Sequence, residues 1–164
     1  MTLDPTPAAG IRYWLMKSEP DEVSIDDLAK APRQTLPWTG VRNYQARNFM
    51  RDQMQPGDGV LFYHSSCPQP GIAGLARIVG GLAADQTQFD SSSPYFDAKS
   101  SRERPRWLQI DVALDRKTRL LTLAEMREQP TLATMRVLQR GNRLSITPVS
   151  DAEWQAVLAL LVER

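Results

Sequence analysis

The chain has 164 residues, enough for one domain with a sizeable hydrophobic core and too few for two domains of ordinary size. Its composition, 41% hydrophobic and 24% charged residues, lies in the ordinary range of globular proteins. The net charge of +1 argues against a broadly basic surface that binds any duplex, so a nucleic-acid contact would have to be a local patch.

Cysteines and metal ligands are scarce. The single cysteine, Cys67, excludes an intrachain disulfide, and with His64 as the only histidine a structural metal site has almost no ligands. We therefore expect no metal and no cofactor. No apolar stretch approaches the length of a membrane span, and residues 1–10 lack the order of a signal peptide. The expectation is a cytoplasmic protein with a flexible lead-in over residues 1–10 and one domain over residues 11–164.

The first predicted elements are short. Residues 13–17 are apolar and aromatic, which favours a buried strand. Ser24 is followed three positions later by Asp27, a capping pair that predicts a short helix up to residue 30. Two prolines in residues 32–40 then predict irregular structure.

The middle of the chain combines one helix with two strands. Asn43 is predicted to cap a helix that runs to about Met54, and residues 55–58 form a turn. Residues 60–65 predict a strand whose side chains alternate between two faces. Glycines among small and β-branched residues in 72–84 predict a strongly bent strand, as at the corner of a small barrel.

The second half begins with a polar stretch, residues 85–106, which predicts a long surface loop. Residues 107–114 alternate as a strand does. The remaining predicted elements are helices that start after Thr122, Thr131 and Ser150, the second ending by Gly141, and a strand over residues 144–149. Strands mixed with short helices and glycine-rich bends predict an α+β domain around a small curved or closed sheet.

Three polar segments are the candidates for a site. The stretch WTGVRNYQARNF at residues 38–49 combines aromatic, guanidinium and amide groups, and from residue 30 to residue 51 there is no acidic residue. KSEP at 17–20 and YHSS at 63–66 each stand at the end of an apolar run. These side-chain types suit a planar, hydrogen-bonding ligand beside a phosphate, so the residues favour a reader of nucleic-acid bases over an enzyme.

An enzyme is the main alternative. His64 stands beside two serines. Ser65 points to the opposite face of a strand, whereas Ser66 could pair with His64 if the strand has already ended; no second histidine or nucleophile elbow exists. Catalysis on a modified base or nucleoside would then fall to Glu19 and Lys17. A small-molecule nucleoside-binding protein is a third possibility. Individual residues also have structural explanations, such as Trp38 as a core aromatic or His64 as a hydrogen-bonded structural histidine.

The strings YWLMKSEPD, WTGVRNYQARNFMRD, GDGVLFYHSS, GIAGLARI, PYFD and GNRLSITPVSDAEW resemble the EVE domain, also called the thymocyte nuclear protein family. This family belongs to the PUA-like superfamily and is related to the YTH domains that read methylated adenine in RNA. The resemblance extends from about residue 13 to about residue 160. It implies a PUA-like fold, a small curved β-barrel flanked by short helices, that binds a modified cytosine or adenine in DNA or RNA.

Carried over to this sequence, the resemblance implies a pocket with walls from all three polar segments. The proposed base-binding residues are Lys17, Ser18, Glu19, Trp38, Val41, Arg42, Asn43, Tyr44, Tyr63, His64 and Ser65. Trp38 would stack on an extruded base at roughly 1–3 kcal/mol, and Asn43 and Ser18 would pair with the base edge. The flanking phosphates are assigned to Lys17, Arg42 and Arg47. The expected partner is a nucleic acid with modified bases, with no membrane partner and no indication of oligomeric state.

Overall fold

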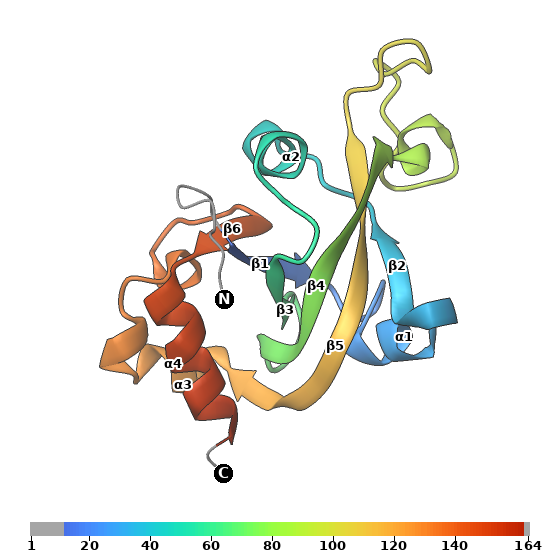
Figure 1. Ribbon diagram of the computed structural model, residues 1–164. Helices are drawn as coiled ribbons and strands as arrows, with labels where there is room; N and C mark the ends of the chain where they lie inside the picture. The colour runs from blue at the N-terminus through green and yellow to red at the C-terminus, as the bar shows by residue number, and fades with distance from the viewer. Residues whose placement is uncertain (1–11, 163–164) are drawn as a thin grey trace, which may run out of the picture.

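A computed structural model describes residues 12–162, in which short helices surround a six-stranded mixed sheet (Figure 1). The strand order is β2-β5-β4-β3-β1-β6, with β1 and β3 parallel and the other neighbours antiparallel. Within these residues β2 and β6 do not pair with each other, so the sheet is an open curved one. The strands are β1 (Tyr13–Ser18), β2 (Thr35–Trp38), β3 (Gly59–His64), β4 (Gly71–Ala84), β5 (Leu108–Thr122) and β6 (Ile146–Val149). The predicted α+β class is confirmed.

Each α-helix begins after the residue predicted to cap it. Asn43 accepts a hydrogen bond from the amide nitrogen of Ala46 at 3.1 Å, and the other three caps are reciprocal pairs of a hydroxyl and a carboxylate. None of the helices within residues 12–162 is long and apolar enough to cross a membrane. The helices are α1 (Ile25–Lys30), α2 (Tyr44–Asp52), α3 (Leu123–Arg127) and α4 (Asp151–Val162).

The helix predicted after Thr131 is wrong. The segment instead contains two short 3-10 turns, Pro130–Leu132 and Arg136–Leu138. The Gln139 side chain donates to two backbone carbonyls of the preceding turn at 3.0 and 3.2 Å, and such bonds compete with helical ones. The two buried anchors of the segment, Leu132 and Met135, are only three residues apart, which suits a 3-10 turn.

The irregular structure predicted for residues 32–40 is also partly wrong, because Thr35–Trp38 forms β2. This strand pairs antiparallel with β5, and Pro37 lies opposite Asp111. Proline lacks the N–H that an inner strand must donate, but β2 is an edge strand and tolerates it. The strand β5 continues to Thr122, beyond the predicted end at residue 114, because its charged residues 115–119 face solvent while the backbone stays paired with β4.

The long β4–β5 ribbon bends the sheet. Its register shifts at four places, for example between Ile78 and Gly80, and each shift is a bulge or irregularity that turns the strand. The bent strand predicted for residues 72–84 is thereby confirmed. In Figure 1 the two strands cross the centre of the molecule as one coiled pair. This coiling curls the sheet so that its two ends approach each other.

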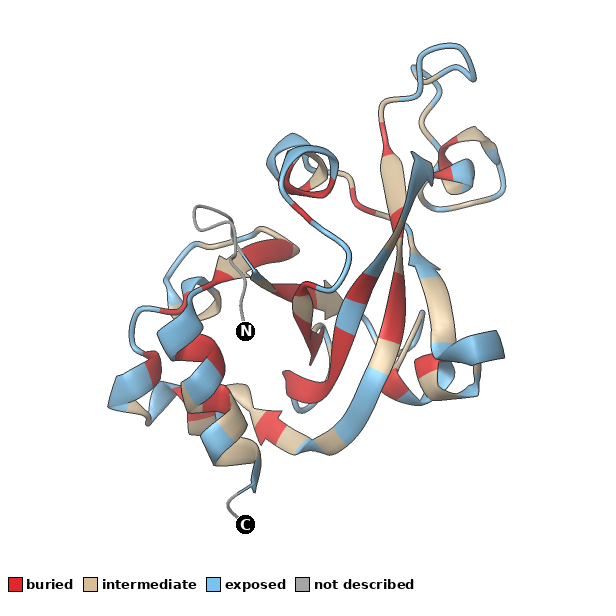
Figure 2. Ribbon diagram, viewed as in Figure 1, coloured by how far each residue is buried: buried red, intermediate tan, exposed pale blue. Residues whose placement is uncertain are grey.

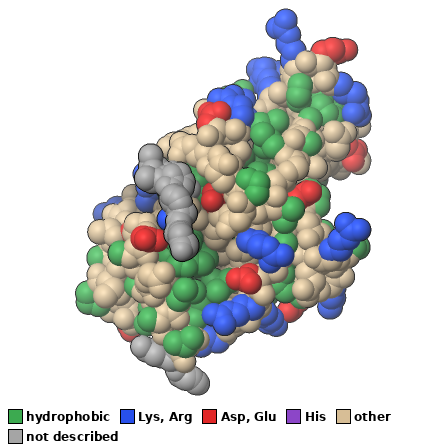
Figure 3. All heavy atoms as spheres, viewed as in Figure 1, with side chains coloured by type: hydrophobic (Ala, Val, Ile, Leu, Met, Phe, Trp, Pro, Cys, Tyr) green, Lys and Arg blue, Asp and Glu red, His purple; other side chains and the backbone are tan. Residues whose placement is uncertain are grey.

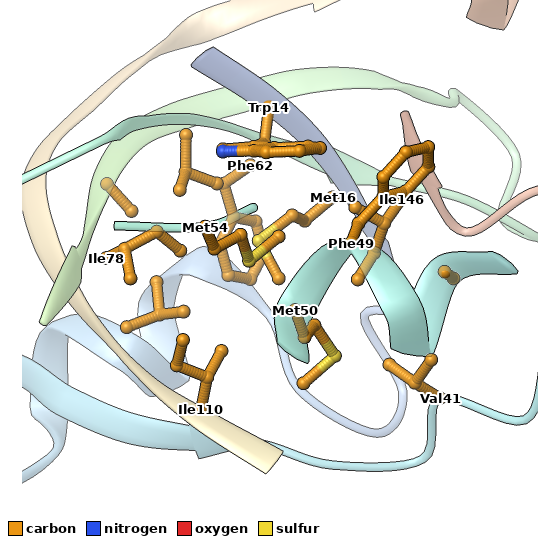
Figure 4. Packing of buried hydrophobic residues seen from close by; sticks show 14 of the residues in the cluster. Trp14, Met16, Val41, Phe49, Met50, Met54, Phe62, Ile78, Ile110 and Ile146 are labelled. Carbon is orange, nitrogen blue, oxygen red and sulfur yellow. The ribbon is translucent and has the colours of Figure 1, made fainter. Parts of the chain in front are cut away.

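Hydrophobic residues pack on both faces of the sheet. Val60 and Phe62 of β3 belong to one cluster of buried residues, whereas Leu61 and Tyr63 belong to a second. The first cluster lies between the sheet and α2 and includes Trp14 (Figure 4). Figure 2 shows that the buried residues follow the strands and the sheet-facing sides of the helices.

Candidate functional site

A cavity of about 320 Å³ lies where the two ends of the curved sheet come together. β2 is the last strand at one end of the sheet and contributes Trp38, while Lys17 of β1 and Ser145, just before β6, come from the other end. Phe62 and Val112 line the cavity from the strands between them. The candidate site therefore lies where the curved sheet stays open between β2 and the β1–β6 end.

One side of the cavity is apolar and aromatic. The rings of Trp38 and Phe62 meet edge to face, with centroids 5.3 Å apart and planes at 75°. Trp38 is half-buried, so part of its indole faces the cavity. Leu28 of α1, Leu36 and Val112 complete this side. Such a surface accepts a flat, apolar face.

The mouth of the cavity carries charged side chains. Lys17, Glu19 and Arg143 all line it, and within residues 12–162 none of them forms an ion pair with another side chain. Partial burial lowers the pKa of Lys17, since the charged ammonium loses solvation. The Ser18 hydroxyl donates to the carbonyl of Val23 at 2.6 Å and keeps lone pairs to accept. These groups are free to bind a polar ligand.

The β4–β5 loop, residues 85–106, contributes Tyr95 to the lining of the cavity. The Tyr95 hydroxyl donates to the carboxylate of Glu22, another cavity residue. Burial and this neighbouring carboxylate raise the pKa of Tyr95 to about 12, so the phenol stays neutral. The sequence analysis missed both residues. The PYFD motif, which contains Tyr95, is the sequence feature that could have identified Tyr95 as a site residue.

Asp85 organises this side of the site. It is fully buried, and its carboxylate accepts from the amide nitrogen of Gly40 at 2.8 Å, from Arg42 at 3.0 Å and from Thr87. Burial would raise the pKa of Asp85, but hydrogen bonds from Thr87, Gly40 and Arg42 outweigh it and hold the pKa below its usual value. Gly40 has a φ of +84°, and a Cβ there would lie 3.0 Å from the Tyr95 ring.

Arg42 points into this network. Besides its ion pair with Asp85, its guanidinium donates to the carbonyl of Tyr95 at 2.7 Å and to the hydroxyl of Thr87 at 3.0 Å. It also lies between the rings of Tyr95 and Trp107, at 5.4 and 5.5 Å from their centroids. The side chain therefore positions the β4–β5 loop.

Of the eleven proposed base-binding residues, six line the cavity and five do not. Those that do are Lys17, Ser18, Glu19, Trp38, Val41 and Ser65. Those that do not are Arg42, Asn43, Tyr44, Tyr63 and His64. Tyr63 points to the opposite face of β3 from Phe62 and packs in the second core cluster, and the side chain of Asn43 caps the start of α2.

Tyr44 and Arg47 lie on the outer face of α2. Tyr44 is 49% exposed and stacks on Trp107, with ring centroids 4.8 Å apart. The Arg47 guanidinium lies 4.7 Å from the Tyr44 ring and donates to Asn48 and to the carbonyl of Arg106. Arg47 thus connects α2 to the β4–β5 loop, and the phosphate contact assigned to it stays a prediction.

His64 holds the start of α1. Its Nε2 atom accepts a hydrogen bond from the amide nitrogen of Ile25 at 3.1 Å, which requires a neutral ring. The pKa of His64 is lowered, mainly because burial disfavours the charged imidazolium. The ammonium of Lys117 lowers this pKa further, and the carboxylate of Asp26 only partly opposes the two effects. This geometry agrees with the interpretation of His64 as a hydrogen-bonded structural histidine.

We expect the stability of the fold to fall as the pH drops from about 7.5 to about 5, because unfolded His64 binds a proton more readily than folded His64. The contribution of neutral His64 to the free energy of unfolding is complete above the pKa of His64 in the unfolded chain. It disappears as the pH falls through the lower pKa of His64 in the folded protein. Urea unfolding across this range measures the effect, and the single imidazole NMR signal reports the pKa. H64Q, which keeps an acceptor, should lose this pH step; an imidazole pKa at or above its ordinary value would contradict the assignment.

A family model of the EVE domain matches residues 12–160. The chain belongs to the EVE domain family. Human thymocyte nuclear protein 1 is 43% identical to it over 165 residues, which cover 90% of this chain and 73% of the human protein. The family predicted from the sequence motifs is thereby confirmed.

Solved EVE domain structures share the fold. The crystal structure of the human THYN1 protein in complex with 5-methylcytosine containing DNA has a TM-score of 0.84 and 42% identity, covering 93% of this chain and 98% of that one. A Pseudomonas putida protein has a TM-score of 0.86 and 48% identity, covering 92% and 99%. These similarities agree with the PUA-like α+β fold.

Proposed function

We propose that this EVE domain binds DNA that carries a modified cytosine and takes the modified base into the cavity. The observation that carries the proposal is the cavity itself, which is lined both by aromatic side chains and by charged groups that form no ion pair within residues 12–162. The human THYN1 protein, which shares the fold, was crystallised with 5-methylcytosine containing DNA. A base inside a duplex cannot reach such a cavity, so the nucleotide must be extruded.

The size of the cavity suits one base. Pockets for small ligands generally measure roughly 300–1,000 Å³. At about 320 Å³ this cavity is near the lower limit, which favours a single planar ring over a larger ligand. An extruded base loses stacking on its neighbours, and the indole of Trp38 would replace it at roughly 1–3 kcal/mol.

The polar groups at the mouth fit the edge of cytosine. Cytosine presents an amino donor beside two acceptors, so it needs a carboxylate next to a donor. Glu19 supplies the carboxylate and Lys17 the donor, and both line the cavity. Thymine presents a carbonyl where cytosine has its amino group, so Glu19 would repel it. The arrangement therefore favours cytosine over thymine.

The geometry favours binding over catalysis. His64 lies outside the cavity, and its Nε2 atom is bonded to the backbone of Ile25. Ser18 donates to a backbone carbonyl, and within residues 12–162 it has no side-chain base as a partner. Within residues 12–162, neither of these two side chains is therefore placed as a nucleophile beside a base.

The proposal predicts that the chain binds a duplex with one 5-methylcytosine about tenfold more tightly than the unmodified duplex, which is the range a pocket gains from one methyl group. Fluorescence anisotropy with labelled oligonucleotides measures the ratio. Thymine at the same position should bind no better than unmodified cytosine. RNA of the same sequence, with and without the methyl group, tests the alternative partner. Equal affinities across the panel would refute the proposal.

A further inference from the structure

The segment that leads into β6 concentrates positive charge. Between residues 129 and 150 the chain has three arginines, Arg136, Arg140 and Arg143, and no acidic residue. All three are exposed, and within residues 12–162 none of them forms an ion pair. Because the whole chain has a net charge of only +1, this cluster is a local feature. In the described part of the chain, folding brings no carboxylate into an ion pair with these three guanidinium groups.

The cluster is built on a well-defined turn, residues 136–143, which we call the arginine turn. The Gln139 side chain donates to two backbone carbonyls at 3.0 and 3.2 Å, and the Asn142 side chain donates to the carbonyl of Arg136 at 2.9 Å. Gly141 has a φ of +80°, a conformation that other residues rarely adopt. Amide side chains thus hold the backbone in place, so the guanidinium groups extend from a preorganised support.

The arginine turn continues directly into the wall of the cavity. Arg143 and Ser145 line the cavity, and the carbonyl of Ser145 accepts from the amide nitrogen of Lys17 at 2.8 Å. The end of the turn is therefore attached to β1 at the point where β1 supplies its own cavity residues. In Figure 1 this segment is the orange stretch between α3 and β6.

We propose that the arginine turn binds the phosphate backbone of the DNA strand whose modified base occupies the cavity. This inference rests on the proposed function and adds the surface that holds the strand outside the cavity. An extruded nucleotide stays covalently joined to the phosphates on both sides, so the surface beside the mouth must face the backbone. Arg143 would meet the phosphate next to the extruded nucleotide, and Arg140 and Arg136 those further along the strand.

Arginine suits this role because its planar guanidinium binds phosphate oxygens in a bidentate manner. Contacts with phosphates give affinity and position but carry no information about the base. In this arrangement the cavity selects the modified base, and the arginine turn adds electrostatic affinity for the phosphate backbone. Removing Arg136 and Arg140, which do not line the cavity, should therefore weaken binding to modified and unmodified DNA to the same extent.

A charge-matched control lies on the β4–β5 loop. Lys99, Arg102 and Arg104 are also exposed, but they are interleaved with Glu103, and Arg102 donates to Gln86 at 3.2 Å. Figure 3 shows Lys and Arg side chains on the lobe at the top of the view together with acidic ones. Replacing these three residues removes three positive charges from the chain, as many as the arginine-turn variant removes. At this site, however, the neighbouring carboxylate of Glu103 already offsets part of the positive charge.

The test compares R136A/R140A/R143A with K99A/R102A/R104A and the unchanged chain by fluorescence anisotropy on modified and unmodified duplexes, between roughly 0.05 and 0.2 M salt. We expect the arginine-turn variant to lose on the order of tenfold in affinity for both duplexes, with a slope of log K against log salt that is shallower by about 2 to 3. The double variant R136A/R140A, which keeps the cavity residue Arg143, should leave the ratio of affinities for the two duplexes unchanged. Circular dichroism confirms that the variants fold.

The outcomes separate this inference from the proposed function. If the arginine-turn variant keeps its affinity and salt slope, or if the control loses as much, the inference is overturned even where the preference for the modified base persists. If the unchanged chain shows no preference for the modified duplex, the proposed function fails. The salt slope on unmodified DNA would then still show whether the arginine turn binds phosphates.

Discussion

Replacing Trp38 by alanine is expected to abolish the preference for DNA with a modified cytosine. The indole forms one wall of the cavity and meets Phe62 edge to face at 5.3 Å, so its removal takes away the surface on which the base would stack. Stacking of one base on an aromatic side chain is worth roughly 1–3 kcal/mol, which corresponds to about 5-fold to 150-fold in affinity. Anisotropy titrations on the modified and unmodified duplexes measure this loss.

Two variants make this experiment decisive. W38F keeps an aromatic ring and should retain most of the preference, whereas Y44A removes an exposed aromatic residue outside the cavity and should leave the preference unchanged. W38A also removes contacts with Phe62 and is expected to lower stability by about 2 kcal/mol, so binding must be measured well below its unfolding temperature. A W38A protein that is folded and still prefers the modified duplex would remove Trp38 from the site.

Replacing Asp85 by alanine is expected to destabilise the fold by about 3 kcal/mol. The carboxylate is fully buried and accepts hydrogen bonds from Gly40, Arg42 and Thr87. Its loss leaves the partly buried guanidinium of Arg42 without its countercharge and the amide of Gly40 without an acceptor. Because Arg42 also holds the carbonyl of Tyr95, the β4–β5 loop should loosen over the cavity. Urea unfolding measures the stability.

D52A is the matched control for the Asp85 variant. Asp52 pairs with Arg51 at 2.8 Å, but both side chains are exposed, so its removal should leave the unfolding midpoint almost unchanged. D85N removes the charge but keeps the shape and one acceptor oxygen, so its unfolding midpoint should lie between those of D85A and D52A. Equal midpoints for D85A and D52A would show that the Asp85 network does not stabilise the fold.

Local patterns in the sequence were sufficient for the starts of the α-helices that form and for most strands, but they also predicted a helix after Thr131 that does not form. The capping pair of Ser24 and Asp27 predicted α1, because the two residues that bond are only three apart and need no other part of the chain. The glycine-rich stretch predicted the bend in β4 for a similar reason. β2 was missed because Pro37 is unfavourable in a strand, and only its place at the sheet edge makes it acceptable.

The candidate site was predictable only in part. Lys17 and Trp38 were identified by residue type and neighbours, and both line the cavity. Asn43 was assigned both a helix cap and a base contact; its side chain caps α2 by accepting from the amide of Ala46, and it does not line the cavity. Tyr95 and Arg143 were missed because neither stands beside the three polar segments in the chain.

The sequence by itself determined the family, the α+β class and the caps of α1 to α4, since each of these depends on neighbouring residues or on continuous motifs. Tertiary structure alone decided which polar side chains face the cavity. Arg42 turns away from it because its carboxylate partner, Asp85, is 43 residues distant along the chain and is brought close only by the fold. A side chain is free to bind a ligand only when no such partner has already taken its hydrogen bonds, and that depends on packing between distant segments.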